Sequence, residues 1–349
     1  MGRSDMSMAA TDQILILGDG QMALVLADAL VVRGIPARIW SPFPKDAASL
    51  RSTRQSPRLP GFRLAPEVDV TDDDDAAFRG VSVAISAIPS QFVRQVWTRL
   101  KVHANEATRS DVPIVSVTKG IEVGTGMRPT QVLGQVLAMD DDDPRLCVLS
   151  GPSIAAELAR RLPATLVAAA SDEAFASRVQ DLLRVPWLRI YRSEDVIGVE
   201  VAGAAKNVIA LAAGMVDGLK AGDNAKSALV ARGLAEIARL GVAMGARVET
   251  FFGVAGVGDL ATTCFSPEGR NRSCGARLGR GERLDDVLAS MTSIVEGVPT
   301  TKSLVEVSRR LAVDMPITAA VHAILFGGLS PRDAIRGLMS REQKAERVG

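Results

Sequence analysis

The most informative stretch of the sequence is Ile14-Leu15-Ile16-Leu17-Gly18-Asp19-Gly20-Gln21-Met22-Ala23. Its apolar start, Ile14–Leu17, predicts a strand, and Gln21–Arg33 predicts a helix that stops at Gly34. Glycines between strand and helix let backbone N–H groups approach a pyrophosphate, whose charge the helix N-terminus favours. The small residue Ala23 still allows close helix–strand packing. The turn therefore predicts a dinucleotide site, with an ordinary turn as the alternative.

Short β-branched runs alternate with helical segments after this turn. Further strands are predicted at Ala37–Trp40, Val81–Ile88, Pro113–Val117, Arg145–Leu149, Ala164–Ala170 and Leu188–Tyr191. This order predicts an α/β fold whose Rossmann-like, mostly parallel sheet is covered by helices on both faces. Ligands of such sheets bind at the carboxyl ends of the strands.

The pattern changes after residue 193 to long, alanine-rich helical segments, Ile197–Leu219 and Ala225–Met244. We therefore predict a dinucleotide-binding domain at 1–193, of which 1–10 are expected to be disordered, and an all-α substrate and catalytic domain at 194–349.

The most apolar stretch, Val199–Val216, contains Glu200, Lys206 and Asn207, so a buried core helix is expected there rather than a membrane span. Its small residues are compatible with packing inside the domain or across a homodimer, and the sequence leaves both open.

The composition limits the kinds of partner that the chain is expected to bind. A net charge of +1 and only 4% aromatic residues argue against nucleic-acid binding. Three cysteines without a CxxC pair fit a reducing cytoplasm, and the N-terminus has no apolar signal segment. The aspartate runs Asp72–Asp75 and Asp140–Asp143 predict solvated loops or helix caps, because adjacent side chains diverge. No metal site is expected.

The second strand ends in Trp40-Ser41-Pro42, without an acidic residue. A simple NAD site places Asp or Glu about 20 residues beyond the glycine turn to hold the ribose 2′-OH. Lys45 lies nearby and could meet a 2′-phosphate. The cofactor is expected to be NAD or NADP, and the missing acid tilts the expectation towards NADP.

Hydride transfer to a carbonyl requires a positioned proton donor. Of the two histidines, His103 lies in a polar segment and is expected at the surface, whereas His322 has apolar neighbours and is expected to pack in the core. Lys206 interrupts a run of small residues, where desolvation would lower its pKa, or its amine could snorkel to solvent. Lys119 follows a predicted strand and is either a second candidate or a surface lysine.

A phosphate site is predicted at Gly269-Arg270-Asn271-Arg272, which follows Gly256-Val257-Gly258-Asp259 and Thr262-Thr263. Arginine binds phosphate oxygens bidentately, and loop glycines expose backbone donors. The phosphate could belong to the cofactor or to the substrate.

From about residue 14 to residue 341 the chain resembles the NAD(P)-dependent glycerol-3-phosphate dehydrogenases. The matching blocks include Ser150-Gly151-Pro152-Ser153, Ala205-Lys206-Asn207, Ala255-Gly256-Val257-Gly258-Asp259-Leu260, Gly269-Arg270-Asn271-Arg272 and Val295-Glu296-Gly297. The resemblance implies reversible NAD(P)H-dependent reduction of dihydroxyacetone phosphate to sn-glycerol 3-phosphate, which supplies glycerophospholipid synthesis.

The resemblance also implies residue roles. Lys206 would be the catalytic lysine that donates and accepts the proton, and Lys119 would lie near both nicotinamide and substrate. The implied substrate contacts are Lys119, Gly151, Ser153, Lys206, Asn207, Asp259, Thr263, Gly269, Arg270 and Asn271. The implied cofactor contacts are Gly18, Gly20, Gln21, Met22, Ala23, Pro42, Lys119, Ala155, Arg270, Ile294 and Glu296.

The chain departs from the family mainly around the cofactor. Ala23 replaces the usual third glycine, and Gln21 and Met22 replace a small or hydroxyl residue and an aromatic one. Pro42 stands where Arg or His is frequent, and Gly269 where many members have serine. Two alternatives stay open, a dehydrogenase of another small anionic hydroxy compound and a non-catalytic dinucleotide-binding module.

Overall fold

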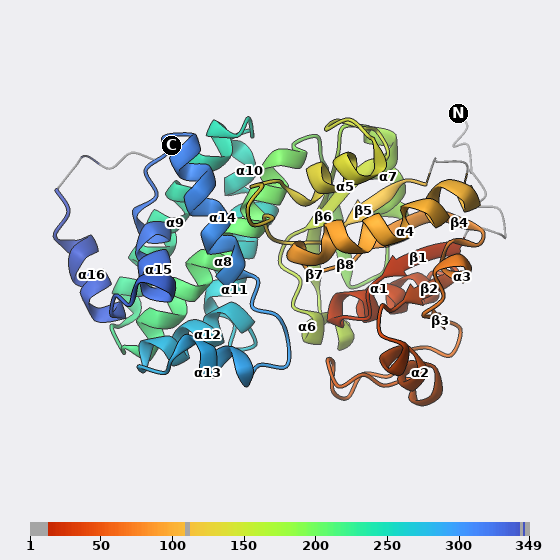
Figure 1. The fold of residues 1–349 in the computed structure, drawn as a ribbon, viewed down its shortest axis with the longest axis horizontal. Coiled ribbons are helices and arrows are strands. Elements are labelled where there is room, and N and C mark those ends of the chain that lie inside the picture. The colour runs from red at the N-terminus through yellow and green to blue at the C-terminus, as the bar shows by residue number, and fades with distance from the viewer. Residues whose placement is uncertain (1–12, 109–111, 343–344, 346–349) are drawn as a thin grey trace.

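The computed structural model describes residues 13–108, 112–342 and 345. These residues form two lobes that lie side by side, one built on a sheet and the other made of helices (Figure 1). The expectation of disorder for residues 1–10 falls outside the described residues.

Eight strands form one sheet in the order β3-β2-β1-β4-β5-β6-β7-β8. They are β1 (Gln13–Leu17), β2 (Ala37–Trp40), β3 (Asp69–Thr71), β4 (Val81–Ser86), β5 (Ile114–Ser116), β6 (Leu146–Ser150), β7 (Ala164–Ala170) and β8 (Leu188–Ser193). Every neighbouring pair is parallel except β6 and β7. The carboxyl ends of β1 to β6 therefore share one edge, and the predicted mostly parallel α/β sheet is confirmed.

The observed sheet differs from the sequence-based expectation in one additional strand and in the bounds of several others. Strand β3 was not predicted, because Val70 is the one apolar residue of Asp69–Thr71 and a single apolar residue makes no recognisable pattern. Strand β4 ends at Ser86 rather than at Ile88, since the Ile88 carbonyl accepts a hydrogen bond from Thr118 Oγ1 (2.7 Å) instead of a neighbouring strand.

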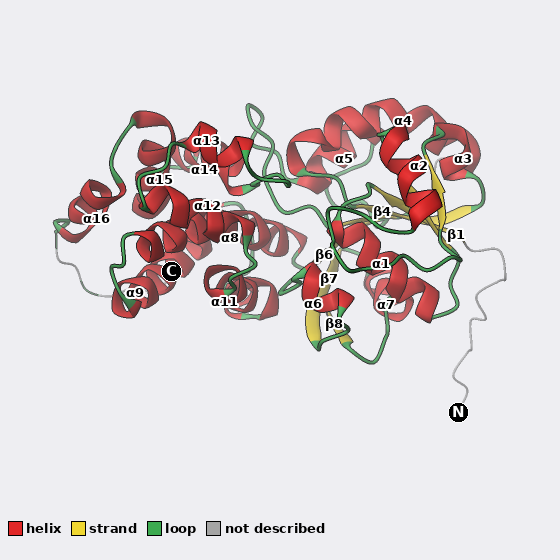
Figure 2. Ribbon diagram, turned by 90° about the horizontal axis from the view of Figure 1, so that it is seen from below, coloured by secondary structure: helices red, strands yellow, loops and turns green. Residues whose placement is uncertain are grey.

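Helices cover both faces of the sheet (Figure 2). The helices on one face are α1 (Gln21–Val32), α6 (Ala155–Ala159) and α7 (Glu173–Leu182). Those on the other face are α3 (Asp74–Phe78), α4 (Val93–Thr108) and α5 (Pro129–Leu137). A further helix, α2 (Pro44–Thr53), packs beside β3. Because Ile14 and Ile16 enter one layer while Leu15 and Leu17 enter the other, β1 is buried on both faces.

The turn between β1 and α1 requires glycine at its first position. Gly18 has φ +108°, and a Cβ there would lie 2.8 Å from the Ala87 carbonyl oxygen. Gly20 precedes α1, and a Cβ at this position would meet no atom within 4 Å. The turn thus packs tightly on its protein side and is open above Gly20.

Only helices follow Ser193 in the described part of the chain. They are α8 (Val196–Gly218), α9 (Asp223–Ala243), α10 (Glu249–Phe252), α11 (Asp259–Phe265), α12 (Arg270–Gly279), α13 (Leu284–Ala289), α14 (Gly297–Arg310), α15 (Pro316–Gly327) and α16 (Pro331–Met339). Helix α8 is long and apolar enough to cross a membrane, but 89% of its apolar window is buried inside the molecule. The prediction of a buried core helix is confirmed.

Helices α8 and α12 approach each other through glycines. A Cβ at Gly214 on α8 would collide with the Arg272 carbonyl, and one at Gly275 on α12 would collide with the Leu211 carbonyl. This close packing holds the N-terminus of α12 against the middle of α8, where Lys206 lies.

Glu236 is a buried carboxylate that joins two helices of the helical lobe. Its carboxylate on α9 accepts hydrogen bonds from Ile317 N (2.6 Å) and from Thr318 N and Oγ1 (both 3.2 Å), at the start of α15. Burial raises the pKa of Glu236 from 4.5 to about 7. The folded protein therefore keeps a proton that the unfolded chain releases between these pH values.

The free energy of unfolding is accordingly expected to fall by about 2–3 kcal/mol as the pH rises from about 5 to about 7.5. Glu236→Gln should remove most of this difference, because the amide does not titrate. Urea denaturation of both proteins at the two pH values measures it. If the free energy of unfolding of Glu236→Gln fell by the same amount between the two pH values, the effect would belong to another group.

Candidate active site

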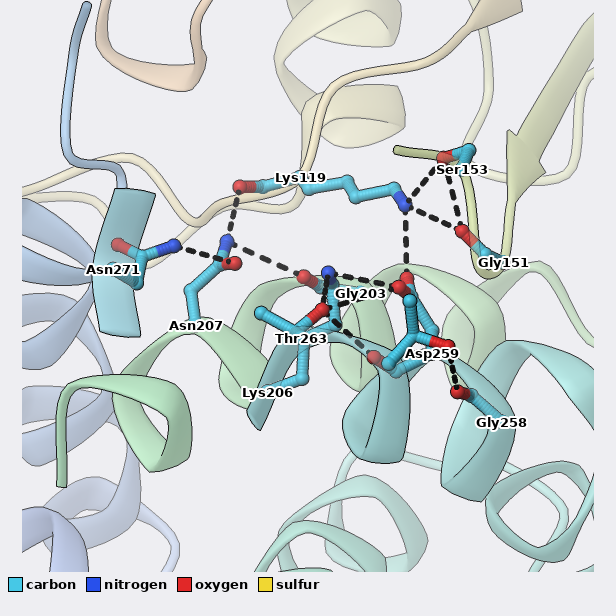
Figure 3. Close-up of polar contacts among 11 residues, drawn as sticks. Lys119, Gly151, Ser153, Gly203, Lys206, Asn207, Gly258, Asp259, Thr263 and Asn271 are labelled. Atoms are coloured by element: carbon cyan, nitrogen blue, oxygen red, sulfur yellow. Dashed lines mark hydrogen bonds and ion pairs between the residues drawn. The ribbon is translucent and has the colours of Figure 1, made fainter. Parts of the chain in front are cut away.

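One buried carboxylate lies between two lysines at the junction of the lobes (Figure 3). Asp259 opens α11, after the π-helical turn η2 (Val254–Gly258). Its Oδ2 is 2.8 Å from Lys119 Nζ, and its Oδ1 is 2.9 Å from Lys206 Nζ. Lys119 comes from the segment after β5 and Lys206 from α8, so three distant segments form this cluster.

The charges of the cluster control the proton affinities of its members. Burial alone would raise the pKa of Asp259, but the two ammonium groups hold it below its usual range. Burial, with a smaller contribution from the charge of Lys119, lowers the pKa of Lys206 to about 8 against the attraction of Asp259. A lysine with this pKa can give up and regain a proton near neutral pH.

Lys206 is almost fully buried. It is 6% exposed, and its Nζ donates to Thr263 Oγ1 (2.5 Å), whose hydroxyl in turn donates to the Asp259 backbone oxygen (2.7 Å). The expected desolvation is confirmed, and the snorkelling alternative is wrong.

Lys119 is also held inside the cluster rather than on a surface loop. Besides Asp259, its Nζ donates to the Gly151 carbonyl (2.8 Å) and to Ser153 Oγ (3.2 Å). Gly151 follows β6 with φ +131°, a conformation that turns its carbonyl towards the lysine at no steric cost for glycine.

A chain of amide hydrogen bonds extends the site across the two lobes. Asn207 Nδ2 donates to the Lys119 carbonyl (3.1 Å), and Asn271 Nδ2 donates to Asn207 Oδ1 (2.9 Å). Gly297 N donates to Asn271 Oδ1 (2.9 Å). The segment after β5 and helices α8, α12 and α14 are thereby fixed relative to one another.

Glu296 connects the helical lobe to the sheet at a second point. Its carboxylate accepts hydrogen bonds from Ser90 N (2.9 Å) and Ser90 Oγ (2.5 Å), and its removal from water raises its pKa. Nearby, Arg270 Nη1 donates to the Ile294 carbonyl at 3.4 Å. Ser90 was not predicted, because a partner 206 residues away leaves no local signal.

The predicted cofactor residues of the glycine turn face the protein with their side chains. The Gln21 amide donates to the Arg58 carbonyl, Met22 packs against the apolar core, and Ala23 is fully buried. The first turn of α1 leaves its backbone N–H groups for a ligand, and the space above Gly20 is open. A dinucleotide therefore fits the backbone of this turn.

The remaining predicted cofactor residues lie in two groups. Pro42 follows β2 and Ala155 begins α6, so both lie at the edge of the sheet that carries the glycine turn. Ile294 and Glu296 come from the segment before α14 in the helical lobe. Gly269 precedes α12, where a Cβ would lie 3.1 Å from the Thr263 carbonyl oxygen.

The other candidate groups lie outside this cluster. His103 pairs with Asp75 (2.6 Å), and His322 is half-buried against Phe326 rather than enclosed in the core. Asp73 accepts from Ala76 N at the start of α3, which confirms the cap interpretation for that run. Among the described residues, no group of three or more His, Cys, Asp or Glu side chains could hold a metal ion.

Comparison with known proteins identifies the family. Models of the N-terminal and C-terminal parts of the NAD-dependent glycerol-3-phosphate dehydrogenases match residues 13–176 and 195–336. The chain belongs to this family. The glycerol-3-phosphate dehydrogenase (NAD(P)+) of Thermobifida fusca (strain YX) is 43% identical over 339 residues, covering 97% of this chain and 99% of the relative. That of Geobacillus thermodenitrificans (strain NG80-2) is 43% identical over 338 residues, covering 96% of each.

A solved structure agrees with the family assignment. The crystal structure of glycerol-3-phosphate dehydrogenase from Coxiella burnetii matches with a TM-score of 0.89 and 32% identity, covering 95% of this chain and 99% of that one. The chain is therefore an NAD(P)-dependent oxidoreductase with glycerol-3-phosphate dehydrogenase activity. This excludes the alternative of a non-catalytic dinucleotide-binding module.

Proposed function

We propose that Lys206 is the acid–base group of this glycerol-3-phosphate dehydrogenase. The observation that carries the proposal is a buried ammonium group with a pKa of about 8, held by Asp259 Oδ1 and Thr263 Oγ1. In reduction, its proton passes to the C2 carbonyl oxygen of dihydroxyacetone phosphate, and solvent then reprotonates the neutral amine. In oxidation, the neutral amine removes the proton of the C2 hydroxyl.

Lys119 and Asp259 position the reacting group in this scheme. The bound nicotinamide supplies or accepts the hydride. Lys119 is fixed at Nζ by Asp259, Gly151 and Ser153, so its charge stays beside the oxygen that becomes negative. Asp259 keeps two like charges together in a buried site, which leaves the cluster with a net positive charge that favours an anionic substrate.

Arg270 and the start of α12 are proposed to hold the substrate phosphate. Arg270 is the first residue of α12, where backbone N–H groups and the helix dipole favour an anion. The neighbouring Arg272 is already paired through Nε with Asp217 Oδ2 (2.7 Å). Among the described residues, the one hydrogen bond of the Arg270 guanidinium is the long one to the Ile294 carbonyl, so the group can turn to a phosphate. Gly269, Asn271 and Asn207 complete this end of the site.

The proposal is tested by an initial-rate assay with dihydroxyacetone phosphate and either NADH or NADPH. Oxidation of one or both cofactors is expected, and unphosphorylated dihydroxyacetone is the matched control for the phosphate contacts. Equal rates with both substrates would remove Arg270 from its proposed role. A higher rate with another small anionic hydroxy or keto compound would favour the alternative substrate.

The two reaction directions should depend on pH in opposite ways. Because the pKa of Lys206 is about 8, kcat for reduction is expected to fall as the pH rises through about 8, where the ammonium is lost. For oxidation, kcat is expected to rise through the same range, where the free amine forms. Profiles of kcat from pH about 6 to pH about 10 in both directions measure this. Parallel profiles would contradict the role of Lys206.

Further proposals concern the organisation and the role of the enzyme. We propose that residues 1–193 form the cofactor-binding domain and residues 194–349 the substrate and catalytic domain, to which Lys119 is added from the first. The change from strands to helices after Ser193 supports this division. We also propose that the enzyme is a homodimer and that it lies in the cytoplasm. Its product, sn-glycerol 3-phosphate, is proposed to supply glycerophospholipid synthesis. Light scattering on the purified protein tests the dimer.

A further inference from the structure

The structure supplies an acid at the place where the second strand lacks one. Strand β2 is followed by Ser41, which is fully buried, and Ser41 Oγ donates to Asp19 Oδ2 (2.9 Å). Asp19 lies between the two glycines of the turn, 22 residues before Ser41. Its carboxylate therefore lies at the carboxyl end of β2, where dinucleotide sites carry the acid that holds the adenosine ribose.

Arg58 fixes this carboxylate from the segment after α2. Its Nη1 donates to Asp19 Oδ2 (3.1 Å), and its Nη2 donates to Asp46 Oδ2 (2.8 Å). The Arg58 carbonyl accepts from the Gln21 amide, and its guanidinium carbon lies 6.0 Å from the centre of the Phe43 ring. The arginine is held from several sides, so it orients Asp19.

One oxygen of Asp19 remains available. Both hydrogen bonds to the carboxylate end on Oδ2, and Oδ1 accepts none within residues 13–108, 112–342 and 345. The side chain is 9% exposed, so this oxygen is close to the surface of the turn. An ionised carboxylate only accepts hydrogen bonds, and a ribose hydroxyl is a suitable donor.

The local charge decides between the two cofactors. Asp19 and Asp46 share the single guanidinium of Arg58, so the ion-paired group carries more negative than positive charge. A 2′-phosphate would bring further negative charge against Asp19, whereas an unmodified 2′-OH would donate to its oxygen. Lys45 is exposed on α2 and makes no ion pair with this group.

We propose that Asp19 replaces the missing acid of β2, binds the adenosine ribose hydroxyls, and makes this enzyme prefer NAD(H) over NADP(H). The preference is the reverse of the one inferred from the sequence. That inference considered only the residues that directly follow β2, whereas the acid comes from the turn that precedes α1.

Calorimetric titration with ADP-ribose and 2′-phospho-ADP-ribose tests the proposal, because the two ligands differ only at the 2′ position and undergo no hydride transfer. We expect the wild-type protein to bind ADP-ribose at least about tenfold more tightly. Asp19→Ala should weaken ADP-ribose binding about tenfold, while binding of the 2′-phosphate form stays constant or improves. Asp19→Asn, which keeps an acceptor oxygen, should retain most of the ADP-ribose affinity and bind the 2′-phosphate form more tightly.

Asp46→Asn is the matched control, because it removes the other carboxylate of Arg58 but not the acceptor at β2. It should leave the affinity for ADP-ribose unchanged and narrow the preference only by binding the 2′-phosphate form somewhat more tightly, since one negative charge is removed. Melting temperatures check that each variant is folded. The proposal is overturned if Asp19→Ala weakens both ligands equally. Tighter binding of the 2′-phosphate form by the wild type, lost in Lys45→Ala, would also overturn it and assign the selectivity to Lys45.

Discussion

Lys206→Met is expected to lower kcat about 10³-fold in both directions while the dissociation constant of the cofactor stays within about twofold. Methionine fills the buried space of the lysine side chain but has no proton to transfer. Asp259 keeps its ion pair with Lys119, so the fold of the cluster is preserved. Steady-state rates and a fluorescence titration of reduced cofactor measure the two quantities.

The matched control is Lys101→Ala, which removes an exposed lysine of α4 and should leave both quantities unchanged. Residual activity that no longer depends on pH between about 7 and about 9 is also expected for Lys206→Met, because the group with the pKa of about 8 is gone. A variant with wild-type kcat would transfer the acid–base role to another group.

Asp259→Asn should impair both stability and catalysis. Asp259 is 1% exposed and pairs with two lysines, so its loss leaves two positive charges together in a buried site. Removal of one partner from a buried ion pair costs about 3–5 kcal/mol. The attraction that raises the pKa of Lys206 also disappears, so the lysine is deprotonated at lower pH. We expect kcat for reduction at neutral pH to fall about 100-fold.

Asp217→Asn provides a control of matched geometry. Asp217 also lies between two cations, Lys226 Nζ (2.9 Å) and Arg272 Nε (2.7 Å), but it is 11 positions further along α8, about 16 Å from Lys206. The control should lose stability without moving the pH profile of kcat. The same shift in both variants would attribute the effect to general loosening of the helical lobe.

Elements with a repeating pattern were predicted well. The bounds of β2 and β7 were predicted as observed, and the long helices α8 and α9 were placed to within two residues. Strand β3 was missed, because it has one apolar residue, whereas β5, of the same length, starts with two.

The side chains proposed for catalysis were accessible to sequence reasoning, but their arrangement was not. A lysine in a run of alanines and glycines on α8 marks a candidate for desolvation, but the sequence alone also allowed its amine to snorkel to solvent. The pairing of Lys206 and Lys119 with one carboxylate could not be inferred, since Asp259 Oδ2 and Lys119 Nζ are joined across 140 residues.

Local pattern was sufficient for the class of fold, the glycine turn and the choice of Lys206 as a candidate, because each depends on neighbours within one strand or one helical turn. The tertiary structure decided which charges meet: the carboxylate between the two lysines, Ser90 on Glu296, and Asp19 at the end of β2. These contacts join residues from 22 to 206 positions apart. Their geometry arises only when the sheet and the α8–α12 packing bring the segments together.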